Sequence, residues 1–399
     1  MSRIISTGID IGTNYVKVVV VEYIRGQHGG IRKIIGTGSS ESNGLRHGYI
    51  IDNQHVARAV RHAVLQAEKS SRVPVKSALV SLGGVGIEAY TTIGSAAVTR
   101  ADGEITQLDI DRALAQCEHS LPDLAKVNRK IIHTIPITNK VDGKEVLGRI
   151  TGMKAGKIEI KTLFVTALEQ HCADLIEAVE QIGIEIEDVV VSPIAGAIAT
   201  LSKAQRIAGC VLVDIGAETV SIIVYENDVP ISLKIFPIGS SDITNDIALG
   251  LRVPLEDAEK LKLGGTLQTP HPRKKLEEII TARLKDIFEL IEAHLKKMGR
   301  NGLLPAGVVL TGGGSRIATI EDLAKHSLAL PSRIGKIEVN STAHGEVYDP
   351  SWTVAYGLGL LGLTPGAASG RNIKELSKGF TALKGVSGKI NDLIKKFLP

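Results

Sequence analysis

The sequence is poor in cysteine and in aromatic residues. Its three cysteines among 399 residues, Cys117, Cys172 and Cys210, form no CxxC pair, which argues against a thiolate metal site or a disulfide framework. Aromatic residues make up 3% of the chain, so we expect no base-stacking surface and no nucleic-acid partner. No run of about 18 apolar residues occurs, and the chain begins with a strand pattern directly after residues 1–3. We therefore expect a cytoplasmic protein without a signal peptide or a spanning helix.

Positive charge is concentrated near the C-terminus. The formal net charge is +4. Residues 371–399 carry seven Lys or Arg residues and two acidic residues, which leaves the rest of the chain near −1. A basic terminal segment of this kind favours an acidic surface as its partner.

Two short segments share one pattern although they are separated by about half of the chain. Residues 8–14 (GIDIGTN) and 213–219 (VDIGAET) each stand between two β-branched runs, which predicts two β-hairpins. Their glycines let backbone N–H groups approach an anion, and an Asp beside phosphates suits a site with Mg2+ between them. One such bend is ordinary turn chemistry. Two of them predict a clamp that holds a nucleotide triphosphate from both sides.

A glycine-rich segment follows a third strand pattern. Residues 308–311 (VVLT) run into Gly312, Gly313 and Gly314, where a purine or ribose could lie against bare backbone. We expect a helix over residues 316–323 after this loop.

In these three segments the chain resembles the actin-like ATPase superfamily, whose connecting helices also match near residues 193–197 and 355–359. The resemblance implies an α/β fold of two lobes, which are duplicated ribonuclease-H-like domains, with ATP and Mg2+ bound between them. The implied metal residues are Asp10 and Asp214. The implied nucleotide residues are Gly12, Thr13, Asn14, Lys17, Gly216, Ala217, Thr219, Glu259, Lys262, Gly312, Gly313, Gly314 and Arg316.

Glu259 and Lys262 lie about one helical turn apart and share a helix face. An exposed ion pair of this spacing contributes little to stability. The superfamily resemblance implies a different role, in which this pair contacts the ribose and the adenine.

The duplicated motif also predicts how the chain is divided. Residues 273–291 show an apolar stripe at helical spacing, which predicts a mainly helical insert in lobe two. The expected boundaries are 1–81 and 167–205 for lobe one, 82–166 for a small α/β insert in lobe one, 206–238 and 303–361 for lobe two, 239–302 for its helical insert, 362–372 for a linker and 373–399 for a tail.

The tail has the pattern of an amphipathic helix. Its apolar and basic residues fall on opposite faces, which is typical of a helix that lies in a membrane interface, although a helix docked on its own protein has the same pattern. We expect attachment to an anionic membrane surface. The residues concerned are Lys389, Ile390, Leu393, Ile394, Lys395, Lys396, Phe397 and Leu398.

Within the superfamily, the chain resembles the FtsA family of bacterial cell-division proteins over nearly its whole length. The resemblance rests on residues 44–52 (GLRHGYIID), on 141–143, 151–153 and 163–167 of the small insert, and on the tail. It implies a peripheral membrane protein at the division site that polymerises through the small insert. It also implies that the helical insert binds the C-terminal peptide of FtsZ, and that the protein recruits further division proteins.

Two residues depart from the superfamily pattern. Glu218 stands in the second hairpin where many relatives carry glycine, and a carboxylate there is unfavourable beside phosphate unless it points away or toward Mg2+. Ser192 precedes Pro193 where relatives that hydrolyse ATP quickly often carry an acid. We therefore expect ATP to act as an assembly switch with at most slow hydrolysis, and no catalytic residue.

Two other interpretations remain open at this point. A pilus-assembly adaptor that resembles PilM would have a similar small insert but no linker and amphipathic tail. A sugar or carboxylate kinase of the same superfamily would need a substrate-side Asp in lobe one, for which the sequence offers no candidate.

Overall fold

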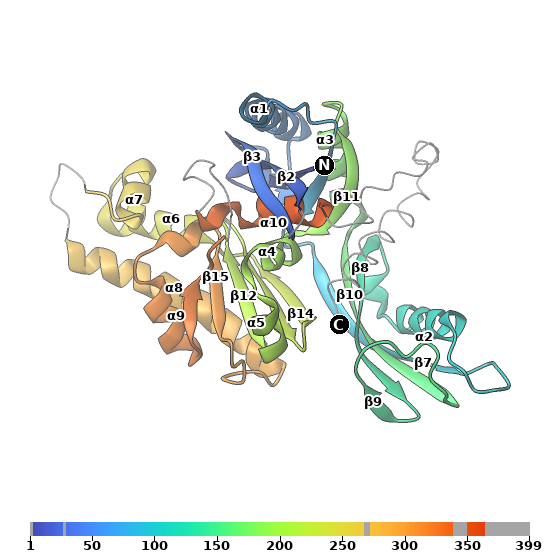
Figure 1. Ribbon diagram of the computed structural model, residues 1–399. Coiled ribbons are helices and arrows are strands. Elements are labelled where there is room, and N and C mark those ends of the chain that lie inside the picture. The colour runs from blue at the N-terminus through green and yellow to red at the C-terminus, as the bar shows by residue number, and fades with distance from the viewer. Residues whose placement is uncertain (1–2, 27–28, 267–271, 338–348, 364–399) are drawn as a thin grey trace.

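The computed structural model describes residues 3–26, 29–266, 272–337 and 349–363, which form two lobes and two inserts (Figure 1). Lobe one is built on a five-stranded sheet in the order β11-β6-β1-β2-β3, with β6 and β11 parallel to β1 and the other neighbours antiparallel. Its strands are β1 (Arg3–Ile11), β2 (Tyr15–Gly26), β3 (Gly29–Glu41), β6 (Ser77–Leu82) and β11 (Glu185–Val191).

Lobe two repeats this topology strand for strand. Its sheet has the order β14-β13-β12-β15-β16, in which β12 and β13 form the hairpin that β1 and β2 form in lobe one, and β15 and β16 run parallel to β12. The strands are β12 (Cys210–Ile215), β13 (Val220–Glu226), β14 (Val229–Phe236), β15 (Val308–Thr311) and β16 (Ser332–Ile334). The duplication predicted from the two hairpins is therefore present in the fold.

Helices pack on both sheets. In lobe one, Asp52 begins α1 (Asn53–Ser71) by accepting a hydrogen bond from the His55 N–H at 2.9 Å, and α1 buries Val56 and Val60 against the sheet. Three further helices are α3 (Glu169–Glu180), α5 (Lys203–Ala208) and α9 (Ile320–Leu328). The short elements are the strands β4 (Leu45–Arg46) and β5 (Tyr49–Ile50) and the 3₁₀ turns η1 (Asp123–Ala125), η2 (Gly313–Arg316) and η4 (Pro350–Trp352).

The small insert of lobe one is an antiparallel sheet with a helix on one face. Its order is β7-β10-β8-β9, and α2 (Gln107–His119) buries Ala113 and Cys117 against it. Asp142 and Gly143 have positive φ at the turn between β8 and β9, which is typical of an Asp-Gly pair in a tight hairpin. The strands are β7 (Glu88–Ala97), β8 (Arg129–Val141), β9 (Lys144–Val146) and β10 (Lys157–Leu168).

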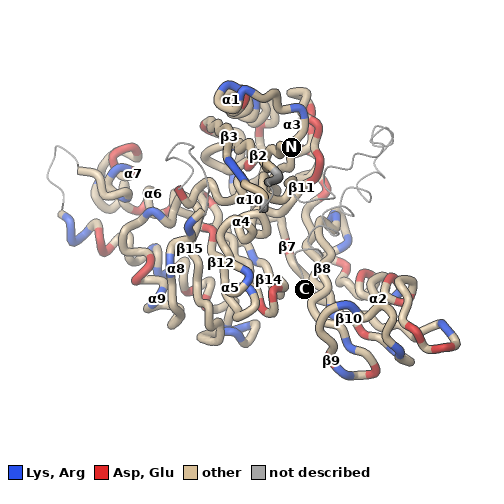
Figure 2. Tube along the Cα trace, viewed as in Figure 1, with Lys and Arg blue, Asp and Glu red and all other residues tan. Residues whose placement is uncertain are grey.

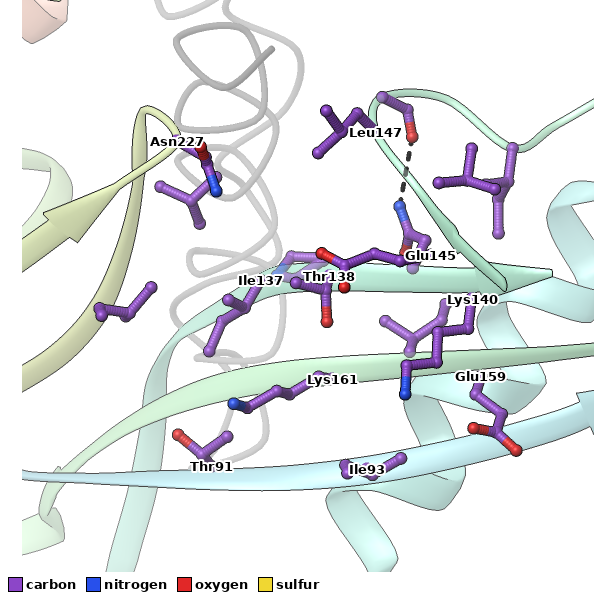
Figure 3. Close-up of a pocket in the computed structure, with 18 of the residues that line it drawn as sticks. Thr91, Ile93, Ile137, Thr138, Lys140, Glu145, Leu147, Glu159, Lys161 and Asn227 are labelled. Atoms are coloured by element: carbon purple, nitrogen blue, oxygen red, sulfur yellow. Dashed lines mark hydrogen bonds between the residues drawn. The ribbon is translucent and has the colours of Figure 1, made fainter. Parts of the chain in front are cut away.

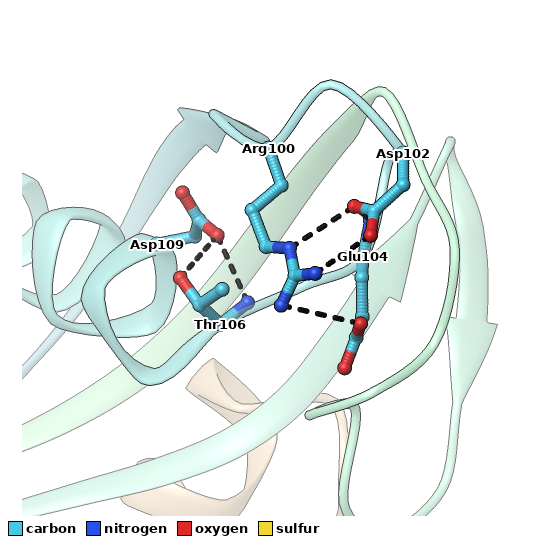
Figure 4. A network of polar contacts seen from close by, with 5 residues as sticks. All are labelled: Arg100, Asp102, Glu104, Thr106 and Asp109. Carbon is cyan, nitrogen blue, oxygen red and sulfur yellow. Dashed lines mark hydrogen bonds and ion pairs between the residues drawn. The ribbon is translucent and has the colours of Figure 1, made fainter.

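A polar network orders the loop before α2 (Figure 4). The Asp109 carboxylate accepts hydrogen bonds from the Thr106 N–H and hydroxyl at 2.9 and 2.7 Å, and these bonds lower the Asp109 pKa to about 2. Arg100 pairs with Asp102 at 2.7 Å and with Glu104 at 3.3 Å. The loop is thus held by its own side chains.

The insert of lobe two is helical, as predicted. It consists of α6 (Ser240–Leu251), α7 (Leu255–Lys262) and α8 (Arg273–Lys297). The apolar stripe of α8 is buried against α6 and the lobe-two sheet, with Leu284, Phe288 and Ile291 fully inaccessible. Along α8, the basic residues of the first turn are followed by residues of both signs (Figure 2).

Two helices cross between the lobes. α4 (Ser192–Thr200) packs on β12 and β13 of lobe two, whereas α10 (Thr353–Gly362) packs on β1 and β2 of lobe one. Where the helices meet, a Cβ on Gly357 would lie 1.9 Å from the Ala195 carbonyl oxygen, so only glycine permits this crossing. Each lobe thus contributes one helix that packs on the sheet of the other lobe.

Two expectations need correction. The helix predicted over 316–323 is wrong at its start, because Ile317 has extended backbone after η2 and α9 begins only at Ile320. Gly362 ends α10 and Leu363 is buried, so these first two residues of the predicted linker belong to the folded body. The rest of the linker and the tail, residues 364–399, lie outside the described residues. Within the described ranges no helix is long and apolar enough to cross a membrane.

Candidate functional site

A cleft of about 780 Å³ opens between the lobes, and the ends of both hairpins line it. Every residue predicted to contact nucleotide or metal also lines it, with one exception. Gly314 lies behind the cleft wall, where a Cβ would stand 2.4 Å from the Ile215 side chain. The predicted residues in the wall are Asp10, Gly12, Thr13, Asn14, Lys17, Asp214, Gly216, Ala217, Thr219, Glu259, Lys262, Gly312, Gly313 and Arg316.

The two hairpins close in the same way. The Gly12 N–H donates to the Tyr15 carbonyl oxygen at 3.1 Å, and the Gly216 N–H donates to the Thr219 carbonyl oxygen at 2.8 Å. Both hydrogen bonds join residues three positions apart, so the two bends have the same length. Each lobe therefore contributes the same kind of backbone bend to the cleft. Facing bends with glycine and a hydroxyl are suited to a phosphate chain.

The two aspartates have different neighbours. Asp10 lies opposite Lys17 in the β1–β2 register, whereas Asp214 lies opposite Ser221 in β12–β13. The hydroxyl of Ser81 donates to Asp10 Oδ1 at 2.7 Å and accepts the Ile11 N–H at 3.0 Å, which fixes the carboxylate of Asp10. A single cation and one fixed carboxylate therefore come from lobe one.

Both carboxyl groups titrate abnormally. Burial raises the pKa of Asp10, although the hydrogen bond from Ser81 and the charge of Lys17 oppose the rise. Burial, and then the charge of Asp10, raise the pKa of Asp214 to about 7. Two partly buried carboxylates that disfavour each other's charge suit a divalent cation, because a cation removes this repulsion. The donor set therefore fits Mg2+.

Lys17 contacts the segment that leads into α10. Its Nζ donates to the Ser351 carbonyl oxygen at 2.8 Å and lies 5.7 Å from the centre of the Trp352 ring. Burial lowers the Lys17 pKa, and the charge of Asp10 offsets part of this. Next to it, Arg316 pairs with Asp349 at 3.4 Å. Sequence reasoning missed the segment 349–352, since no local signal links it to the hairpins.

Glu259 and Lys262 belong to a larger hydrogen-bond network and do not form an isolated surface ion pair. Lys262 Nζ lies 2.6 Å from Glu259 Oε2, and it also donates to the Ser240 carbonyl oxygen and to the Thr244 hydroxyl. Lys262 is buried and its pKa is lowered by burial, whereas Glu259 is half exposed. The network ties α7 to α6 and leaves Glu259 at the rim of the cleft.

Glu218 and Ser192 are the two residues that depart from the superfamily pattern. The Glu218 carboxylate points away from the phosphate hairpin and accepts the His47 N–H at 2.5 Å. Ser192 lines the cleft at the start of α4. Among the described residues, the carboxylates that line the cleft are Asp10, Asp214, Glu259 and Asp349, so no acid takes the place of Ser192.

A larger hollow, of about 1650 Å³, lies between the small insert and lobe two (Figure 3). Lys161, Thr91 and Ile93 of the insert sheet lie on one side, and Asn227 of the β13–β14 turn lies on the other. The predicted nucleotide residues all lie elsewhere. The candidate nucleotide site is therefore the smaller cleft, which the paired hairpins line.

The chain matches known families over most of its length. Residues 211–357 match the family described as cell division protein FtsA, and residues 84–166 match the SHS2 domain inserted in FtsA. The second range falls within the insert predicted at 82–166.

Whole-chain relatives agree with these matches. The cell division protein FtsA of Bacillus subtilis is 30% identical over 372 residues, which cover 88% of this chain and 81% of the relative. That of Borreliella burgdorferi is 29% identical over 415 residues, with 98% and 95% covered.

Among solved structures, a chain of the PilM-PilN type IV pilus biogenesis complex superposes with a TM-score of 0.69 at 18% identity, covering 90% of this chain and 99% of that one. The ethanolamine utilization protein EutJ from Carboxydothermus hydrogenoformans superposes with a TM-score of 0.52 at 14% identity, with 90% of each chain covered. At these identities the likeness concerns the fold alone. The predicted actin-like two-lobe fold is confirmed.

Proposed function

Because this chain belongs to the FtsA family of bacterial cell-division proteins, we propose that it is an ATP-binding assembly protein that attaches division filaments to the cytoplasmic membrane. ATP binding is supported chiefly by the pair of equivalent hairpins that line one cleft, each with a partly buried Asp at its base. The membrane part rests on the sequence of the tail and on the family resemblance.

The chain's own residues would divide the work of holding nucleotide. Backbone N–H groups at residues 13–14 and 217–219 bind the phosphates from both lobes, and Lys17 supplies positive charge from lobe one. Asp10 and Asp214 hold Mg2+, directly or through water, and the ion in turn screens them from the phosphates. The glycine loop at Gly312 and Gly313 and the rim residue Glu259 receive the nucleoside.

We propose slow hydrolysis or none. A base that activates water must lie within hydrogen-bond reach of it. Ser192 lines the described cleft at the start of α4, where rapidly hydrolysing relatives often carry an acid. Its hydroxyl is a weak base. ATP then acts as a switch for self-assembly, and the protein is not an enzyme in the metabolic sense.

Membrane attachment would depend on assembly. Each basic residue near an anionic surface contributes about 1 kcal/mol, and inserted apolar side chains add to this. Against these stand the costs of ordering and immobilising the tail, so one copy binds reversibly. A filament presents many tails at once and binds far more firmly. The C-terminal peptide of FtsZ would bind the helical insert of lobe two, α6–α8.

Vesicle flotation tests this proposal. The full chain should float with anionic vesicles, and more so with Mg-ATP, whereas a chain truncated after residue 370 should stay in solution. Ile390→Glu and Phe397→Glu should behave like the truncation and keep normal ATP affinity. If the full chain and the truncated chain behave alike, the tail is not an anchor. The proposed membrane attachment through the tail would then be wrong, while membership of the FtsA family would stand.

A further inference from the structure

Glu218 connects the phosphate hairpin of lobe two to lobe one. Its carboxylate accepts a hydrogen bond from the His47 N–H at 2.5 Å, and its backbone oxygen lies 3.1 Å from His47 Nδ1. A carbonyl oxygen accepts only, so the ring nitrogen is the donor in this second contact. Two hydrogen bonds thus join the tip of one hairpin to a single residue across the cleft.

His47 is in turn joined to the segment that leads into the small insert. The Val85 N–H donates to the His47 carbonyl oxygen at 3.1 Å. A Cβ on Gly48 would lie 2.3 Å from the Gly84 Cα, and both glycines have positive φ, so the two backbones touch without room for a side chain. A shift of residues 47–48 therefore displaces residues 83–85.

That segment is anchored in both lobe one and the insert. His171 Nε2 of α3 lies 2.8 Å from the Gly83 carbonyl oxygen, and Arg129 Nη2 of β8 donates to the Gly86 carbonyl oxygen at 2.6 Å. Strand β7 of the insert begins at Glu88, two residues beyond Gly86. Gly48, Gly83 and Gly84 also line the nucleotide cleft.

We propose that Glu218 is a positioning residue that couples the nucleotide cleft to the small insert. Nucleotide that contacts the backbone of residues 216–219 would restrict the motion of the lobe-two hairpin. The hairpin then holds His47 in place through Glu218, and His47 holds residues 83–88, where the chain enters the small insert. The proposal rests on the nucleotide-binding function proposed above. A small residue at position 218 would keep the backbone contact to His47 but would lose the carboxylate contact, which is the stronger bond because its acceptor is charged.

Hydrogen–deuterium exchange of the full chain, with and without Mg-ATP, tests this coupling. In the wild type, Mg-ATP should slow exchange at both hairpins, at residues 44–52 and at residues 83–90. In Glu218→Ala the hairpins should still respond, while the response at 83–90 should fall to about a third or less. Glu226→Ala is the matched control, because Glu226 lies in the same sheet and pairs with Arg300 away from the cleft; its exchange pattern should match the wild type.

The outcomes separate the two proposals. An undiminished response at residues 83–90 in Glu218→Ala, with both hairpins protected, would overturn the coupling and leave nucleotide binding intact. No protection of the hairpins in the wild type would overturn nucleotide binding and the coupling with it. If Glu218→Ala folds poorly, Glu218→Gln keeps an oxygen acceptor without the charge. The response at 83–90 should then fall to about half, and an unchanged response would again contradict the coupling.

Discussion

Asp10 and Lys17 are direct partners across the β1–β2 hairpin, with the carboxylate and the ammonium on the same face of the cleft. The equivalent pair in lobe two is Asp214 and Ser221, which carries no cation. The duplicated fold therefore holds an asymmetric site, in which only the lobe-one hairpin pairs its aspartate with a cation. Lys17 also donates a hydrogen bond to the Ser351 carbonyl oxygen before α10, which holds this charge in the cleft wall.

Ser81→Ala should weaken Mg-ATP binding by about tenfold. The Ser81 hydroxyl fixes Asp10 and also satisfies the Ile11 N–H, and the loss of a hydrogen bond to a charged group costs about 1.5–3 kcal/mol. Calorimetric titration with Mg-ATP measures the change. Ser77→Ala is the control on the same strand, since Ser77 bonds Glu187 at the other end of β6. Equal affinity in the Ser81 variant and the wild type would show that the position of Asp10 does not matter.

Affinity for Mg-ATP should rise from pH 6 to pH 8. The Asp214 pKa is about 7, above its ordinary value, so roughly a tenth of the molecules have the ionised form at pH 6 and about nine tenths at pH 8. Only the ionised form holds Mg2+, which predicts an affinity gain of up to about tenfold over this range. Asp214→Asn should bind more weakly and lose this part of the pH dependence. A pH profile that is the same in both proteins would contradict the assignment of Asp214.

Gly357→Ala should destabilise the protein by about 3 kcal/mol or more, because the new Cβ would stand 1.9 Å from the Ala195 carbonyl oxygen and force α4 and α10 apart. Gly196→Ala is the matched control in the same helix crossing. There the Cβ would make an ordinary 3.4 Å contact with Leu212, and alanine favours the helix by about 0.5–1 kcal/mol. Urea unfolding measures both. Similar midpoints for the two variants would mean that the crossing relaxes without cost.

Most of the features predicted from the sequence were indicated by patterns within single hairpins or helices. Each hairpin is specified by a short run of glycine and β-branched residues, and the stripe of α8 is equally local. The repeat of one hairpin pattern then implied the second lobe. The fold class followed from these signals because they are contained in single elements.

Contacts between distant segments could not be predicted in this way. Ser81 meets Asp10 because β6 lies beside β1, 71 residues further along the chain, and Ser351 meets Lys17 across 334 residues. The direction of Glu218 is set by His47 of the other lobe. The predicted helix over 316–323 failed because the glycine loop closes first in a 3₁₀ turn, which residue propensities do not reveal.

The most direct test of the account is a calorimetric titration of the full chain with ATP, in Mg2+ and in EDTA, beside Asp10→Asn. The account predicts one site that depends on Mg2+, with at least a tenfold loss of affinity in EDTA and in the variant. Absence of binding by the wild type, or equal affinity in all three titrations, would contradict a nucleotide clamp built from the two hairpins.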